Sequence, residues 1–146
     1  MPAQQLPAII NALFTEIEKL LPSYLLNKEE ECIANGNCAA CIIDEDGMVY
    51  GRLYGTYKIR SREAFRVAWT KASQVWITGL KTGEYEKKFF NNEVAECGIE
   101  TPDLIGWEGG QPLKLKDGTK LSAGFSGIRG IYDLEIMVKA VEALGV

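Results

Sequence analysis

The chain of 146 residues contains no histidine. This absence excludes catalytic triads built on histidine, zinc sites with histidine ligands and haem held by a proximal histidine. Any acid–base chemistry must then come from carboxylates, lysine, tyrosine or cysteine. A lone catalytic serine has no histidine to activate it, although a lysine can take that role.

Long apolar runs and an excess of basic residues are also lacking. No stretch approaches the ~20 apolar residues that a membrane-spanning helix needs, so we expect no membrane partner. Lys plus Arg is 16 and Asp plus Glu is 20, giving a net charge of −4. This balance argues against a nucleic-acid partner, because phosphate backbones are bound by clustered basic residues. The first residues lack a basic segment followed by an apolar one, so we expect a cytoplasmic protein.

Four cysteines are present, and two of them, Cys38 and Cys41, have the C-x-x-C spacing. That spacing is used for zinc and for redox chemistry, but zinc wants four ligands and a redox pair opens a helix. If this stretch is a strand instead, the two thiols point to opposite faces of a sheet. We favour buried structural thiols and predict no metal site, because cysteine is among the residues most often buried.

The remaining composition is that of one ordinary domain, 1–146, with 47% hydrophobic and 25% charged residues. Apolar spacing predicts helices over 6–21, 23–34, 61–77, 83–91 and 132–144. Two hairpins are predicted, one from strands 38–44 and 48–54 and one from runs 112–115 and 120–125 around Asp117-Gly118. The order αα-ββ-αα-ββ-α predicts an α+β fold, a central antiparallel sheet built from hairpins with helices packed on it.

The second hairpin runs into a glycine-rich loop, Ser126-Gly-Ile-Arg-Gly130, which opens onto the last helix. A strand, a glycine-rich turn and a helix N-terminus direct free backbone N–H groups at one point. We therefore predict an anion-accepting site here, with these ligand-binding candidates: Arg52, Gly109, Gly110, Ser126, Gly127, Arg129 and Tyr132. A purely structural role for the glycines, with Asp133 as a helix cap, is the alternative.

In strand 48–54, Tyr50, Arg52 and Tyr54 share one face with Met48, while Val49, Gly51 and Leu53 share the other. We predict that the second set faces the core. Arg52 between two tyrosines is then either part of an anion or aromatic site, or a solvated side chain.

The order of motifs resembles the GlcG/HbpS-like family, described as a haem-degradation or haem-binding domain and also found at the C-terminus of some corrinoid adenosyltransferases. The resemblance covers roughly residue 35 onward and is carried by the following stretches: Ile42–Val49, Arg52–Gly55, Ala64–Ala72, Gly109–Pro112, Asp117-Gly118, Gly124–Gly127 and Asp133. It implies a central antiparallel sheet, self-association into dimers or larger rings, and a tetrapyrrole or small ligand near the glycine loops.

Two functional hypotheses follow. The first is a binding protein for a small molecule, with haem as the candidate cofactor. Without histidine the iron would need Tyr, Cys or Met, and Tyr54, Tyr57 and Tyr132 are the predicted candidates. The second is an enzyme acting on a small organic acid or biosynthetic intermediate, with Asp133 or Glu108 as base and Tyr54 or Tyr132 as acid.

Overall fold

The computed structural model describes residues 5–25, 36–94, 98–99 and 105–146. Its helices and strands follow one another along the chain as α1 (Leu6–Tyr24), β1 (Ala39–Ile43), β2 (Val49–Leu53), α3 (Lys58–Thr78), α4 (Glu84–Phe90), β3 (Gly110–Lys114), β4 (Lys120–Ser126) and α5 (Gly130–Leu144). None of the described helices combines the length and apolar character that crossing a bilayer requires.

The four strands form one antiparallel sheet in the order β2-β1-β4-β3. Each hairpin pairs its own two strands, and β1 then pairs with β4 to join the hairpins. In this central pairing Ala39 lies opposite Ser126 and Ile43 opposite Ser122. The glycine-rich loop after Ser126 therefore lies at the end of the two central strands where β1 begins.

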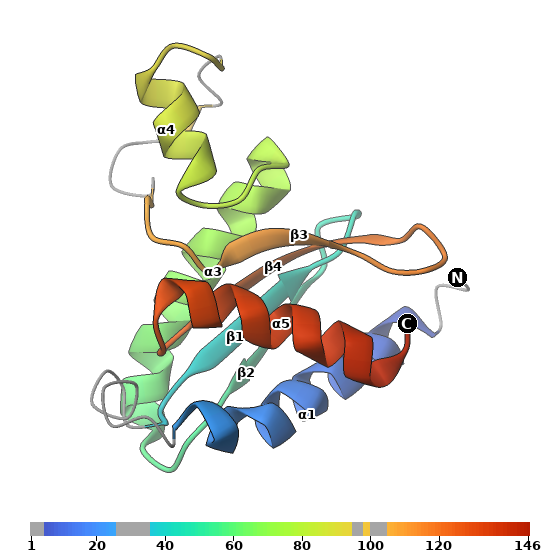
Figure 1. Cartoon of the computed structure of the whole chain (residues 1–146). Helices are drawn as coiled ribbons and strands as arrows, with labels where there is room; N and C mark the ends of the chain where they lie inside the picture. Colours follow the sequence, from blue (N-terminus) through green and yellow to red (C-terminus); the bar gives the residue numbers. More distant parts are fainter. Residues whose placement is uncertain (1–4, 26–35, 95–97, 100–104) are drawn as a thin grey trace.

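Helices cover both faces of the sheet (Figure 1). α1 and α5 lie on one face, where Ala40 and Ile42 of β1 join the main apolar cluster. α3 lies on the other face, where Cys41 and Ile43 pack against its alanines. The alternation along β1 follows the two-residue period of a strand, and every residue of β1 is buried. α4 projects beyond the layers, at the top of Figure 1.

This architecture confirms the predicted α+β class and both hairpins. Cys38 belongs to the α1/α5 cluster and Cys41 to the α3 cluster, so the two thiols do occupy opposite faces. Both are free and buried. The predicted helix order differs at the N-terminus, because α1 continues through Pro22 to Tyr24. The rest of the predicted second helix, residues 26–34, lies outside the described residues.

The predicted core face of β2 was wrong. Tyr50 and Tyr54 belong to the α1/α5 cluster, while Gly51 faces the Phe65 ring of α3. The prediction assumed a sheet with one covered face, whereas helices pack on both. The following helix also begins earlier than predicted, at Lys58. Ser61 lies inside it and donates its hydroxyl to the carbonyl of Tyr54.

Candidate functional site

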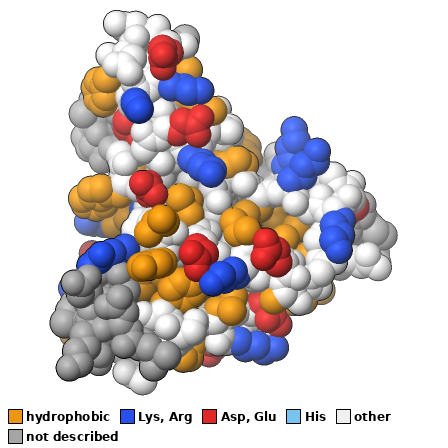
Figure 2. All heavy atoms as spheres, in the orientation of Figure 1, with side chains coloured by type: hydrophobic (Ala, Val, Ile, Leu, Met, Phe, Trp, Pro, Cys, Tyr) orange, Lys and Arg blue, Asp and Glu red, His pale blue; other side chains and the backbone are white. Residues whose placement is uncertain are grey.

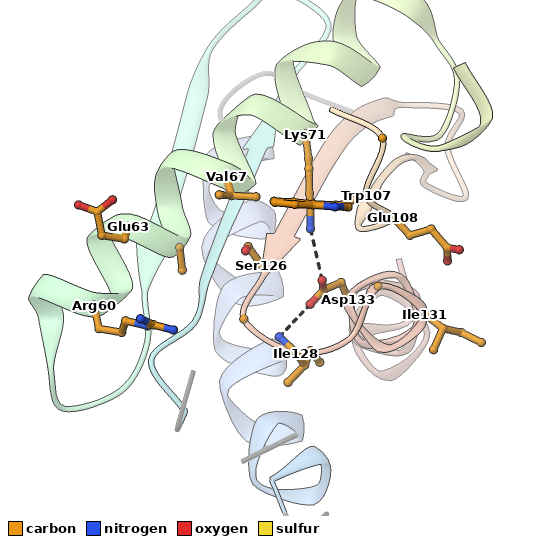
Figure 3. Close-up of a pocket in the computed structure, with 14 residues that line it drawn as sticks. Arg60, Glu63, Val67, Lys71, Trp107, Glu108, Ser126, Ile128, Ile131 and Asp133 are labelled. Atoms are coloured by element: carbon orange, nitrogen blue, oxygen red, sulfur yellow. Dashed lines mark hydrogen bonds and ion pairs between the residues drawn. The ribbon is translucent and has the colours of Figure 1, made fainter. Parts of the chain in front are cut away.

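A cavity of about 720 Å³ opens between the first half of α3, the segment before β3 and the turn from β4 into α5 (Figure 3). Its size falls within the range of ~300–1,000 Å³ that is usual for small-molecule sites. Apolar and charged groups both line it: Arg60, Glu63, Ala64, Val67, Lys71, Gly106, Trp107, Glu108, Ser126, Gly127, Ile128, Gly130, Ile131 and Asp133.

A buried ion pair lies at the inner end of this cavity. Lys71 of α3 and Asp133 of α5 point toward each other, with Lys71 Nζ 3.3 Å from Asp133 Oδ2 (Figure 3). Each side chain is only 3% exposed. Lys71 Nζ also donates to the carbonyl oxygen of Phe125, at 3.0 Å. Two charges withdrawn from water in this way need such partners to be tolerated.

The buried position of Lys71 follows from the pattern of α3. Lys71 lies between Ala68 and Ala72 on the helix face that packs on the sheet, and all three are buried. The main chain at the start of β3 makes room for it. A β-carbon on Gly110 would lie 3.1 Å from the β-carbon of Lys71, and one on Gly109 would lie 2.5 Å from Lys71 Nζ. These two glycines thus permit the lysine to reach Asp133.

Burial shifts the titration of the groups around this pair. Desolvation lowers the pKa of Lys71 below its ordinary value, and the charge of Asp133 opposes that shift only in part. Burial raises the pKa of the Cys38 thiol to about 12, and the negative charge of Asp133 adds to this. Cys38 therefore stays a neutral thiol beside the pair. It is no candidate for a thiolate nucleophile or metal ligand.

The loop between β4 and α5 already uses part of its hydrogen-bonding capacity within the protein. Asp133 Oδ1 accepts a hydrogen bond from the backbone N–H of Ile128, at 3.2 Å (Figure 3). Asp133 also lies in the first turn of α5, where a carboxylate is favoured by the helix dipole. The Ile128 amide, one of those expected to bind a ligand anion, is thus already bound to the Asp133 carboxylate.

Exposed side chains surround the mouth of the cavity. Trp107 is 70% exposed and Ile131 is 63% exposed. Figure 3 shows the Arg60 guanidinium directed into the cavity and Glu63 directed away from it. On the surface, Figure 2 shows hydrophobic side chains among acidic and basic ones over the middle of the face below α4. A ligand at this mouth would meet both apolar surface and a cation.

The segment that carries Trp107 is anchored by a buried glutamine. Gln74 of α3 accepts a hydrogen bond from the backbone N–H of Ile105 and donates one to its carbonyl, at 2.9 and 3.1 Å. The same amide donates to Glu86 of α4, whose other carboxylate oxygen accepts from the backbone N–H of Gly83. α3 therefore fixes both the start of this segment and the base of α4.

The structure brings together only some of the predicted site residues. Ser126, Gly127 and Asp133 line the cavity, and Gly109 and Gly110 pack against Lys71 behind it. Arg129 is exposed at the N-terminus of α5 and is not part of the lining.

Three other predicted residues lie on the α1/α5 side of the sheet. Arg52 contacts α1, with its guanidinium 5.6 Å from the centre of the Phe14 ring and 3.1 Å from Thr15 Oγ1. Tyr54 is buried and donates its hydroxyl to the carbonyl of Phe14, and Tyr132 packs on the Tyr24 ring. The predicted acid–base pair of Asp133 with Tyr54 is therefore not assembled in this cavity.

Sequence reasoning missed Lys71, Trp107 and Arg60. A signal for Lys71 was present, since it is a charged residue within the alanine stripe of α3. Such a residue on a buried helix face requires a partner. Nothing local marks Trp107 or Arg60, which reach the cavity only through the packing of the layers. Among the residues that the structure describes, no cluster of three or more Cys, Asp or Glu forms a metal site.

The fold is one that several solved structures share. HbpS is 18% identical, with a TM-score of 0.56 over 93% of this chain and 89% of HbpS. PduOC in its haem complex is 19% identical, with a TM-score of 0.57 over 89% of this chain and 92% of PduOC. The Klebsiella pneumoniae protein ORFY is 14% identical, with a TM-score of 0.59 over 95% of this chain and 89% of ORFY.

These likenesses confirm, at the level of the fold, the resemblance to GlcG/HbpS-like proteins. No protein-family model matches the sequence, and a comparison with curated proteins gives no match either.

Proposed function

We propose that this chain binds a small organic molecule in the cavity between α3 and the β4–α5 turn. The observation that carries the proposal is the combination of a cavity of about 720 Å³ with a buried ion pair at its inner end. Binding sites of this kind have mostly apolar walls and a few polar groups that fix orientation. Val67, Trp107 and Ile128 supply the apolar part here.

A tetrapyrrole is the first candidate ligand, because a protein of the same fold has been solved as a haem complex. A flat apolar ring suits the surface offered by Trp107, Ile128 and Ile131. A ligand carboxylate is bound by the Arg60 guanidinium, which is directed into the cavity. We therefore propose Arg60, in the lining of the cavity, for the anion-accepting role that the sequence predicted for the glycine loop.

The described lining does not fit ligation of haem iron. Iron in haem is held by histidine, cysteine, methionine or tyrosine. The chain has no histidine, and the described lining contains none of the other three. The hydroxyl of Tyr54 is already donated to Phe14. A tetrapyrrole is therefore held through its ring and its carboxylates, with no bond to a central metal.

Titration with haem and with metal-free protoporphyrin tests this proposal. We expect saturable binding of both with comparable affinity, seen as a shifted Soret band and quenched tryptophan fluorescence. Arg60→Gln weakens this binding, whereas Arg52→Gln, on the opposite face of the sheet, leaves it unchanged. Weaker binding in the Arg52 variant alone would place the ligand on the α1/α5 face of the sheet and contradict the proposed site. No saturable binding of either porphyrin would exclude a tetrapyrrole.

We also propose that the chain forms a homo-oligomer. Three large apolar side chains of α3 are 44–49% exposed: Trp69, Trp76 and Ile77. Apolar side chains gathered on one face commonly mark a protein interface. Native mass spectrometry of the wild type and of Trp69→Lys tests this, with dissociation of the variant as the expected result. A cytoplasmic location remains a prediction of the sequence.

A further inference from the structure

We propose that Lys71 captures a carbonyl compound: its side-chain nitrogen condenses with an aldehyde or ketone in the cavity to form an iminium ion. This inference deepens the proposed function and rests on the same cavity. It names carbonyl compounds as a ligand class for this cavity besides the tetrapyrrole, and it gives Lys71 a reactive role with Asp133 as its proton partner.

The geometry at Lys71 leaves one direction open for a reacting group. An ammonium group has three donors. Among the described residues, Nζ donates to two acceptors, Phe125 O at 3.0 Å and Asp133 Oδ2 at 3.3 Å. Gly109 lies tightly behind it, since even a β-carbon there would come within 2.5 Å of Nζ. As Lys71 lines the cavity, a carbonyl carbon approaches the nitrogen from the cavity side.

The local environment increases the share of neutral amine that such a reaction needs. Lysines become nucleophiles when desolvation disfavours their charge. Lys71 is buried, and desolvation is the largest influence on its pKa, which is lowered. Asp133 lies next to Nζ and is positioned to accept a proton. Geometry and charge thus supply a nucleophile together with its base.

The step balances in atoms and charge. Lys71 transfers one proton from its ammonium to the Asp133 carboxylate, which leaves a neutral amine. The amine nitrogen attacks the carbonyl carbon, and a nitrogen-bound proton moves to the carbonyl oxygen to give a carbinolamine. Asp133 returns its proton to the hydroxyl, the carbon–oxygen bond breaks and water leaves. The product is a protonated iminium on Lys71 facing the Asp133 carboxylate, so the buried ion pair is restored.

A second lysine in the chain provides a matched reference. Lys139 pairs with Glu135 at 2.7 Å, but its side chain is 52% exposed. Its partner raises its pKa. Both lysines have an adjacent carboxylate, and they differ in burial and in access to the cavity. Preferential reaction at Lys71 is therefore attributable to its site.

The experiment uses glyoxylate, a small aldehyde with a carboxylate, and cyanoborohydride to trap the imine as a stable amine. Peptide mapping by mass spectrometry then gives the rate of labelling at each lysine. We expect Lys71 to be labelled faster than Lys139, since a lowered pKa enlarges the neutral fraction of Lys71 whereas the pKa of Lys139 is raised. Labelling at Lys71 should saturate with glyoxylate concentration. Asp133→Asn should slow it, because the carbinolamine hydroxyl then lacks its proton donor, and Lys71→Arg should abolish the fast phase.

Equal or slower labelling of Lys71 relative to Lys139 in the folded wild type would overturn the inference. This comparison needs no variant, so it holds even if the substitutions unfold the protein. Porphyrin binding is measured on the same preparation. Porphyrin binding without fast labelling refutes the reactive lysine and leaves the proposed function standing. Fast, saturable labelling without porphyrin binding supports the lysine and refutes the tetrapyrrole.

Discussion

Gly109 and Lys71 lie so close together that a single carbon added to Gly109 would collide with the lysine nitrogen. A β-carbon on Gly109 would lie 2.5 Å from Lys71 Nζ and 2.7 Å from the Phe125 carbonyl oxygen. The backbone of Gly109 also has φ of +128°, a conformation that residues with side chains rarely adopt. The buried position of Lys71 therefore depends on a glycine at position 109.

Gly109→Ala is expected to destabilise the fold by about 1–3 kcal/mol through backbone strain alone. It should also displace Lys71 and reduce its labelling by glyoxylate. Urea unfolding gives the first quantity and peptide mapping the second. Gly118→Ala is the matched control, because Gly118 also has positive φ, +93°, but a β-carbon there meets no atom within 4 Å. Equal stability losses with unchanged labelling in both variants would show that the contact with Lys71 is unimportant.

Asp133→Asn leaves a buried ammonium without its counter-charge and should cost about 3–5 kcal/mol at pH 7. The loss should shrink as pH rises through the lowered pKa of Lys71, because the lysine then becomes neutral. Urea unfolding at pH 7 and pH 9.5 measures the difference. Adding Lys71→Met to the same variant should recover part of the stability. A loss that is equal at both pH values would show that Lys71 does not change its charge between pH 7 and pH 9.5.

Because the cysteine thiols are buried, we expect the folded protein to lose stability at alkaline pH. Burial raises the pKa of Cys41 from its ordinary value of 9.0 to about 12, so the unfolded chain loses this proton first. The stabilisation is complete below pH 9 and is lost as pH rises toward 12, at up to about 1.4 kcal/mol per pH unit. Urea unfolding of reduced protein from pH 8 to 10.5 should show a smaller pH slope for Cys41→Ala. An unchanged slope would assign the loss to other groups.

Trp107→Ala should weaken ligand binding while leaving stability almost unchanged, because the indole is 70% exposed and lines the cavity. Loss of a stacking aromatic costs about 1–3 kcal/mol of binding free energy when the partner is a flat ring. Fluorescence or absorbance titration with protoporphyrin measures the affinity. Phe90→Ala is the control, since Phe90 is 71% exposed on α4 and is not part of the cavity. Equal weakening by both variants would argue for non-specific binding.

Local chemistry accounts for what the sequence predicted well. The Asp117-Gly118 pair between two apolar runs predicts a hairpin, and β3 and β4 form it. The period of two in β1 predicts thiols on opposite faces, as observed. Each of these inferences needs only residues that are near one another in the chain. The glycine loop also lies between a strand and the last helix, as predicted, and its Ser126 and Gly127 line the cavity.

Long-range packing accounts for what the sequence did not reveal. Lys71 and Asp133 are 62 positions apart, and only the packing of α3 and α5 around the β4 terminus brings them together. Arg52 and Tyr54 were assigned to the site because their strand face was taken as open. Helices pack on both sides of the sheet, and α1 contacts both residues.

The β1–β4 pairing that joins the hairpins has a consequence for biosynthesis. β1 and α3 leave the ribosome long before β4 and α5. The edge of β1 that pairs with β4 therefore has no partner strand while α4 and the following residues are translated. During that interval Lys71 has neither Asp133 nor the Phe125 carbonyl to receive its protons. A nascent chain of this protein therefore lacks the buried ion pair, and with it the inner end of the cavity, until translation has passed α5.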